Sequence, residues 1–188
     1  MKHLGTKELE TKRLLLRKFT LNDVDAVFKN WVNDNDVTKF LTWKTHNNKE
    51  ITKNILEDWI QKYTENNFYL WAIVLKEINE PIGTISIVRS SDKIKMVEFG
   101  YCIGKSWWKK GITSEALNEC IKYFFEEVGI NRIEAKFVKE NENSGKVMIK
   151  CGMTYEGLMR QDHLCNYGLS DTKHYAILAE DYFTKMKI

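Results

Sequence analysis

The chain has 188 residues, a length that one hydrophobic core can serve, and we expect a single domain over residues 1–188. Hydrophobic residues make up 43% and charged residues 29%, values typical of globular proteins that exclude a disordered chain. The net charge of +3 is too small and too dispersed to indicate nucleic-acid binding. Because no apolar run resembles a signal peptide or a membrane span, we expect a cytoplasmic protein with no membrane partner.

Cysteines and histidines are scattered along the sequence. No two of the four cysteines form a C-x-x-C pair, and the four histidines stand far apart. Neither the spacing of zinc sites nor a secreted disulfide framework is present, so we expect no metal.

The predicted elements follow from hydrophobic periodicity and from the residues that start and stop helices. Strands are expected at 13–19, 68–75, 81–88, 94–103, 132–138, 155–160 and 173–178. Helices are expected after the capping cluster at 20–23, after the polar stretch at 45–48, and at 111–128 and 143–150. The short connections between residues 68 and 103 favour antiparallel pairing of three successive strands. This order predicts an α+β domain with a mixed sheet.

One segment carries a pattern with chemical meaning. A strand ending at Gly104 leads through a basic loop to Gly111 and then into a helix. Free amides at a helix start form a concave anion site, and a glycine there lets the backbone approach a pyrophosphate. Lys109 and Lys110 add positive charge, which suits a nucleotide-bearing ligand such as coenzyme A. The alternative is an ordinary turn with solvated lysines, because neither a Walker loop nor a dinucleotide fingerprint is present.

Further motifs follow in a fixed order. They are Asn-Glu-Asn-Ser at 141–144, Val-Met-Ile-Lys-Cys-Gly-Met-Thr-Tyr-Glu-Gly at 147–157, and the end segments at 10–17 and 171–178. Together with the glycine loop they resemble the GNAT superfamily, in particular its RimJ/RimL branch of ribosomal-protein N-terminal acetyltransferases. The resemblance implies a mostly antiparallel central sheet with helices on both faces and a V-shaped splay between two central strands.

The resemblance also implies that acetyl-CoA lies in this splay. The strand at 132–138 would be one arm, and Gly100 would mark a bulge in the other arm. The residues expected to bind the coenzyme are Tyr101, Cys102 and Ile103 along the pantetheine, Asn141 beside it, and Trp108, Lys109, Lys110, Gly111, Ile112, Thr113 and Ser114 around the pyrophosphate. The loop departs from the superfamily pattern Q/R-x-x-G-x-G/A at Trp108 and Thr113, so only Gly111 matches it.

Two side chains are expected to act in catalysis. By resemblance, Glu98 would be a base acting through water, the alternative being a structural carboxylate paired with a lysine. Ser144 would protonate the departing thiolate, the alternative being a helix N-cap. A backbone amide near Cys102 or Ile103 would polarise the thioester carbonyl. Cys102 itself has no adjacent histidine, which disfavours a covalent acetyl-enzyme.

The acceptor is open on sequence alone. A protein N-terminus leads by resemblance, and a polyamine, an amino acid, a drug amine or a non-catalytic acyl-CoA-binding module are the alternatives. We expect the acceptor groove between the first two helices and a late loop at 161–170. Acidic and basic residues alternate around positions 34–58, so charge does not decide the acceptor class. The sequence leaves both a monomer and a homodimer open.

Overall fold

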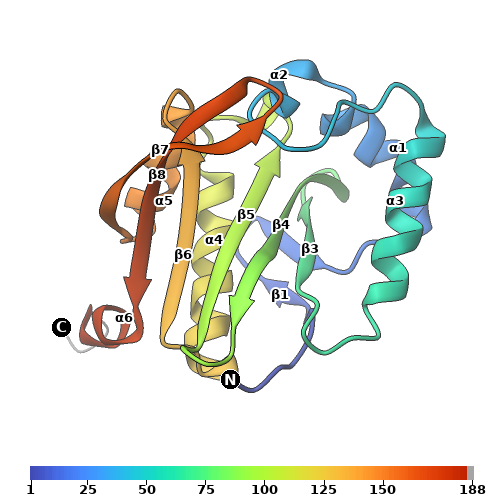
Figure 1. Ribbon diagram of the computed structural model, residues 1–188. Coiled ribbons are helices and arrows are strands. Elements are labelled where there is room, and N and C mark those ends of the chain that lie inside the picture. Colours follow the sequence, from blue (N-terminus) through green and yellow to red (C-terminus); the bar gives the residue numbers. More distant parts are fainter. Residues whose placement is uncertain (186–188) are drawn as a thin grey trace.

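The computed structural model describes residues 1–185 and contains an eight-stranded sheet in the order β1-β2-β3-β4-β5-β6-β8-β7 (Figure 1). The strands are β1 (Leu9–Glu10), β2 (Leu14–Arg17), β3 (Leu70–Leu75), β4 (Glu80–Ser91), β5 (Met96–Ile103), β6 (Arg132–Val138), β7 (Thr154–Cys165) and β8 (Gly168–Leu178). The helices are α1 (Val24–Val27), α2 (Asn35–Thr38), α3 (Lys49–Lys62), α4 (Ile112–Tyr123), α5 (Glu142–Lys150) and α6 (Ala179–Lys185). Among the strands of residues 1–185, only β5 and β6 pair in parallel, so the predicted mixed, mostly antiparallel sheet is confirmed.

Helices cover both faces of the sheet, as expected. All six residues of β3 are buried, and they divide by alternation between the two faces. Trp71, Ile73 and Leu75 pack with α4 in the larger core. The remaining three, Leu70, Ala72 and Val74, pack with the segment around α1 and with α3 in a smaller core. Figure 1 shows α4 on one side of the sheet and α1 and α3 on the other.

Helix α4 is bracketed by two glycines in the left-handed region. Gly111 has φ of +72° at its start, and a π-helical turn at Phe124–Val128 extends it to Gly129, where φ is +74°. A side chain would strain the backbone at both positions. The predicted helix over 111–128 therefore corresponds to α4 with its π-helical extension.

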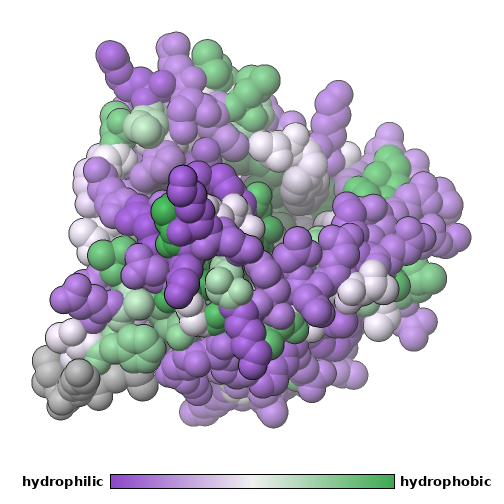
Figure 2. Space-filling view, turned by 60° about the horizontal axis from the view of Figure 1, so that its bottom comes forward, coloured by the Kyte–Doolittle hydropathy of each residue, from purple (hydrophilic) through white to green (hydrophobic). Residues whose placement is uncertain are grey.

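The outer surface is largely hydrophilic. Figure 2 shows one face on which hydrophobic side chains lie in separate small areas. No helix among residues 1–185 is both long and apolar enough to cross a membrane.

Strands β5 and β6 separate partway along their length. Met96–Phe99 pairs with Arg132–Ala135, and the pairing ends there although both strands continue. Figure 1 shows the two strands diverging toward the end at which α2 lies. The V-shaped splay predicted by resemblance is thus present between the expected strands.

The bulge predicted at Gly100 lies instead on the neighbouring strand. The register between β4 and β5 shifts between Ile87 and Arg89, which makes Val88 the extra residue. A Cβ on Gly100 would stand 2.8 Å from Val88 Cγ1. Gly100 is required by the close approach of this bulge.

Three parts of the element prediction are corrected. The expected loop at 161–170 is the tip and the flanks of a long β7–β8 hairpin, with Asn166 and Tyr167 as its turn. Helix α2 is only four residues long and leaves too short a periodic pattern to detect. Helix α6, which follows β8 directly, was also missed.

Candidate active site

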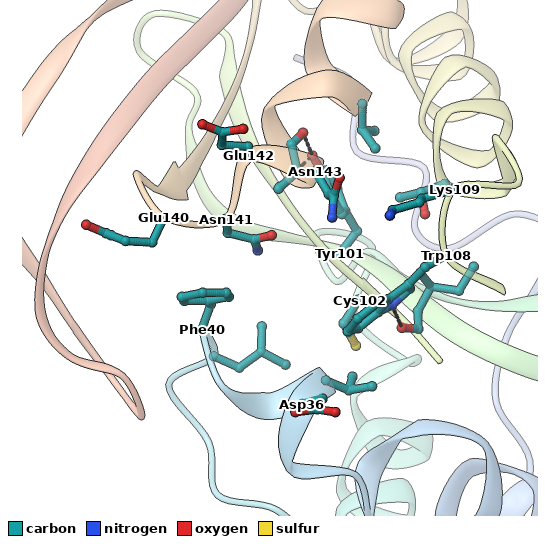
Figure 3. A pocket seen from close by; sticks show the side chains of 16 residues that line it. Asp36, Phe40, Tyr101, Cys102, Trp108, Lys109, Glu140, Asn141, Glu142 and Asn143 are labelled. Atoms are coloured by element: carbon teal, nitrogen blue, oxygen red, sulfur yellow. Dashed lines mark hydrogen bonds between the residues drawn. The ribbon is translucent and has the colours of Figure 1, made fainter. Parts of the chain in front are cut away.

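A pocket of about 400 Å³ opens at the splay. Three walls enclose it: the end of β5 with the loop before α4, the segment from Glu140 to Val147 at the start of α5, and the segment from Asp36 to Leu41 around α2. Figure 3 shows side chains from all three walls around one space, with the carboxylates of Glu140 and Glu142 at its outer side. The topology therefore joins the splay and the glycine loop in a single site.

The loop before α4 has an unusual backbone. Lys109 has φ of +61°, and Gly111 has φ of +72°. Alternating left-handed residues at a helix start turn successive N–H groups toward one side and create an anion-binding concavity. A Cβ on Gly111 would lie 3.3 Å from Lys150 Nζ and 3.8 Å from Arg13 Nη2, so two further cations stand beside the cradle.

Fixed contacts hold this loop on both sides. The Trp108 indole N–H donates to the carbonyl oxygen of Ile103 at 2.8 Å. On the other side Arg13 donates to the carbonyl oxygen of Lys110 at 3.0 Å and forms an ion pair with Glu115 in the first turn of α4. These contacts hold the backbone of the cradle in place.

The structure brings most of the predicted coenzyme-binding residues together. Those that line the pocket are Tyr101, Cys102, Ile103, Trp108, Lys109, Thr113 and Asn141, with Ser144 from the catalytic pair. Four others belong to the cradle without lining this pocket: Lys110, Gly111, Ile112 and Ser114. Ile112 and Ser114 are buried, so they offer backbone amides rather than side chains to a phosphate.

Ser144 forms a hydrogen bond with the side chain of Tyr101, which the sequence did not identify as its partner. Its Oγ–H donates to the Tyr101 hydroxyl at 3.0 Å, and that hydroxyl donates to the carbonyl oxygen of Ser144 at 3.0 Å. Burial raises the pKa of Tyr101, so its hydroxyl stays protonated. Asn141 occupies the N-cap position of α5, and the N-cap alternative for Ser144 is therefore wrong. The Ser144 hydroxyl lines the pocket from inside the first helical turn.

Glu98 lies outside the pocket, where β5 and β6 are still paired. It is 7% exposed, and one of its carboxylate oxygens accepts from Arg89 Nε at 2.8 Å. Arg89 also donates to Glu134 at 2.6 Å, and Glu134 pairs with Arg132. This ion-pair network favours the structural alternative, with arginine in place of the expected lysine.

The Cys102 thiol is unsuited to nucleophilic attack. Burial raises its pKa to about 12, so the thiolate is scarce at neutral pH. This agrees with the expectation that the cysteine is not a covalent catalyst. No group of three His, Cys, Asp or Glu residues within 1–185 is placed to hold a metal ion.

A backbone donor faces the splay at Ile103. The N–H of Gly104 donates to the carbonyl oxygen of Ile82 in β4 at 2.9 Å. Because backbone groups of successive strand residues point to opposite sides, the Ile103 N–H points away from β4 and toward the splay. The Ile103 N–H therefore lies on the open side of β5.

One side of the pocket carries carboxylates without a charged partner among residues 1–185. Glu140 and Glu142 line it, and neither forms an ion pair or hydrogen bond within the part of the chain that the structure describes. Asp36 lies on the opposite wall and pairs with Lys105. Their neighbours in the sequence include lysines, so the sequence alone did not single these carboxylates out.

Comparison with known proteins agrees with this geometry. A family model described as an acetyltransferase (GNAT) domain matches residues 13–154. An uncharacterized N-acetyltransferase of Bacillus subtilis, YoaA, is 32% identical over 170 residues, 90% of this chain and 96% of that protein. A GNAT-family acetyltransferase structure from Bacillus anthracis superimposes with a TM-score of 0.80 at 29% identity, covering 93% of this chain and 99% of that one.

One relative has a named acceptor. The ribosomal protein uS5-alanine N-acetyltransferase of Escherichia coli is 34% identical over 82 residues, which is 44% of this chain and 41% of that protein. The residues that match the family model include both the splay between β5 and β6 and the glycine loop. The chain belongs to the GNAT acetyltransferase family and is an N-acetyltransferase that uses acetyl-CoA.

Proposed function

We propose that the protein transfers the acetyl group of acetyl-CoA directly to the N-terminal amine of a protein or peptide, in a ternary complex. The observation that carries this proposal is a single pocket that joins the phosphate cradle, the splay and two unpaired carboxylates. The partial similarity to a ribosomal-protein alanine N-acetyltransferase supports a peptide terminus as the acceptor.

In the proposed complex the pyrophosphate lies on the amides of 109–114, and the pantetheine extends along Tyr101–Ile103 with Asn141 beside it. The Ile103 N–H donates to the thioester oxygen, which becomes negative as the amine attacks. Lys150 and Arg13 add positive charge near the phosphates, partly replacing the polar side chain that Trp108 does not supply.

The transfer balances in four changes. A neutral amine nitrogen attacks the carbonyl carbon, the C–N bond forms, the C–S bond breaks, and the nitrogen loses one proton while sulfur gains one. Ser144 is the proposed donor to sulfur, and it must turn its hydroxyl away from Tyr101 to donate. The proton that leaves the nitrogen passes through water and restores the Ser144 hydroxyl. Glu140 and Glu142 attract the ammonium form of the acceptor to the pocket, and the amine loses its proton to water before attack.

The test is thiol release from acetyl-CoA with matched acceptors. The panel contains peptides with free N-termini, the same peptides with blocked N-termini but a free lysine, and small amines such as a polyamine. The proposal predicts turnover with free N-termini and none with the blocked set. Turnover with small amines alone would reject a peptide N-terminus as the acceptor, but it would still be an acetyltransferase reaction.

A further inference from the structure

The turn of the β7–β8 hairpin is fastened to the loop between α2 and α3. The backbone N–H of Asn166 donates to the carbonyl oxygen of Leu41 at 3.0 Å. Its side-chain amide donates to the carbonyl oxygens of Thr38 at 2.9 Å and of Trp43 at 2.7 Å. Asn166 thus binds three carbonyl oxygens of one distant segment. The two bonds from its side chain span 128 and 123 positions of the sequence.

Aromatic contacts add to this fastening. The rings of Phe40 and Tyr167 lie 5.3 Å apart between centroids. Lys39 Nζ stands 4.9 Å from the Tyr167 ring and 5.2 Å from the Phe40 ring, within cation–π distance of both. We call residues 38–43 together with 166–167 the strap. Figure 1 shows the hairpin reaching across to α2 to form it.

The inner side of the strap is a wall of the pocket. Phe40 and Leu41 line the pocket on this side, and Glu140 and Glu142 line it on another. Figure 3 shows Phe40 facing the segment that carries Glu140 and Asn141. An apolar wall and the segment that carries the two carboxylates therefore border the pocket on these two sides.

The space is also limited. The pocket of about 400 Å³ includes the surface of β5 that the pantetheine end must occupy. Pockets for one drug-sized ligand measure about 300–1,000 Å³, so a bound donor would take up part of this space. On the strap side the ring of Phe40 borders the pocket, so a large first side chain of the acceptor would meet this ring.

We infer that Asn166 is a positioning residue that sets acceptor specificity: by fixing the strap, it restricts the enzyme to amines carried on a small first residue. This inference rests on the proposed function. Asn166 lies at the turn, outside the coenzyme cradle, so its effect reaches the acceptor and not acetyl-CoA. The apolar ring of Phe40 would contact the first side chain of the acceptor.

The decisive variant is Asn166→Asp, which keeps the size of the side chain but turns an oxygen toward the carbonyls of Thr38 and Trp43. Leu164→Ala is the matched control, because Leu164 lies in the same hairpin with 71% of its surface exposed. Peptides that differ only in an N-terminal alanine or tryptophan serve as acceptors. Asn166→Asp loses two hydrogen bonds that hold the strap, so the strap should admit the larger residue more easily. We expect the ratio of kcat/KM for the alanine peptide to kcat/KM for the tryptophan peptide to fall about tenfold.

Acetyl-CoA affinity in Asn166→Asp should stay within about twofold of the parent, since the phosphate cradle is untouched. Leu164→Ala should keep the parental ratio. An unchanged ratio in a folded Asn166→Asp protein with normal acetyl-CoA binding would overturn the inference. If the parent acetylates only small amines, the proposed acceptor class fails, and the same ratio is then measured with a small and a bulky amine.

Hydrogen exchange gives a readout that is independent of turnover. Asn166→Asp should speed exchange in the segment 38–43, and Leu164→Ala should not. Equal exchange in that segment for both variants would show that Asn166 does not fasten the strap.

Discussion

Trp108 donates its indole N–H to the carbonyl oxygen of Ile103 at 2.8 Å, which ties the phosphate loop to the end of the splayed strand. The loop would hold the pyrophosphate, and the strand end would hold the thioester. This hydrogen bond therefore helps to set the distance between the two ends of the coenzyme site.

Trp108→Phe removes this hydrogen bond and keeps an aromatic ring. A typical intramolecular hydrogen bond contributes about 1 kcal/mol, so acetyl-CoA affinity should fall about fivefold. Calorimetry measures this. Trp107→Phe is the matched control, because the Trp107 indole N–H makes no hydrogen bond within residues 1–185. Equal affinities for both variants would contradict the coupling of loop and strand.

Ser144→Ala tests the proton donor to sulfur. Loss of a general acid should lower kcat on the order of a hundredfold, with little change in acetyl-CoA affinity. Tyr101→Phe removes the hydroxyl that accepts from Ser144 Oγ, and it should lower kcat less because the serine remains. Normal turnover in Ser144→Ala would reject the assignment.

Glu98→Gln separates a base from a structural carboxylate. Since Glu98 pairs with Arg89 and lies outside the pocket, we expect a stability loss of about 1 kcal/mol and a parental pH–rate profile. Thermal melting and kcat/KM across pH measure the two effects. A lower rate that recovers at high pH would instead identify Glu98 as the base.

His46 makes the acceptor side of the fold sensitive to acid. Its side chain is buried against Trp43 and bonds to Thr52 Oγ1 at 2.9 Å. Burial lowers its pKa. The unfolded chain, with a pKa of about 6.5, therefore takes up the proton more readily. The contribution of His46 to stability is therefore complete above that pH, and it is lost as the pH falls below it and through the lower pKa of the folded state.

His46→Gln should show a smaller drop in Tm between pH 8 and pH 5.5 than the parent shows. The variant cannot take up that proton in either state, so this part of the acid sensitivity disappears. An equal drop in Tm in both proteins would show that His46 does not contribute to the acid sensitivity.

The sequence sufficed for features fixed by local chemistry. Gly129 ends a helix because only the left-handed region allows that turn, and the alternating pattern of Arg132–Val138 gives that strand its observed bounds. The glycine loop and its place before α4 followed from Gly111. The splay itself came from family resemblance and not from periodicity.

The rest depends on contacts between distant segments. Nothing local to Asn166 reveals that it binds Thr38 and Trp43, and nothing local to Tyr101 reveals its bond to Ser144. Lys109 adopts φ of +61° although lysine disfavours that region, so its strain is set by the surrounding loop. Glu98 resembled a base by position alone, and its pairing with Arg89 depends on the β4–β5 register.

The most direct test of the central claim is calorimetric titration of acetyl-CoA into Gly111→Asp and Gly129→Asp. The two glycines have nearly equal φ values, +72° and +74°, and lie at opposite ends of one helical segment. A Cβ at 129 meets nothing within 4 Å, whereas one at 111 approaches Lys150 in the cradle. Gly111→Asp should weaken binding at least about tenfold, or about 1.4 kcal/mol, while Gly129→Asp binds like the parent. Parental affinity in a folded Gly111→Asp protein would contradict the phosphate site and the account built on it.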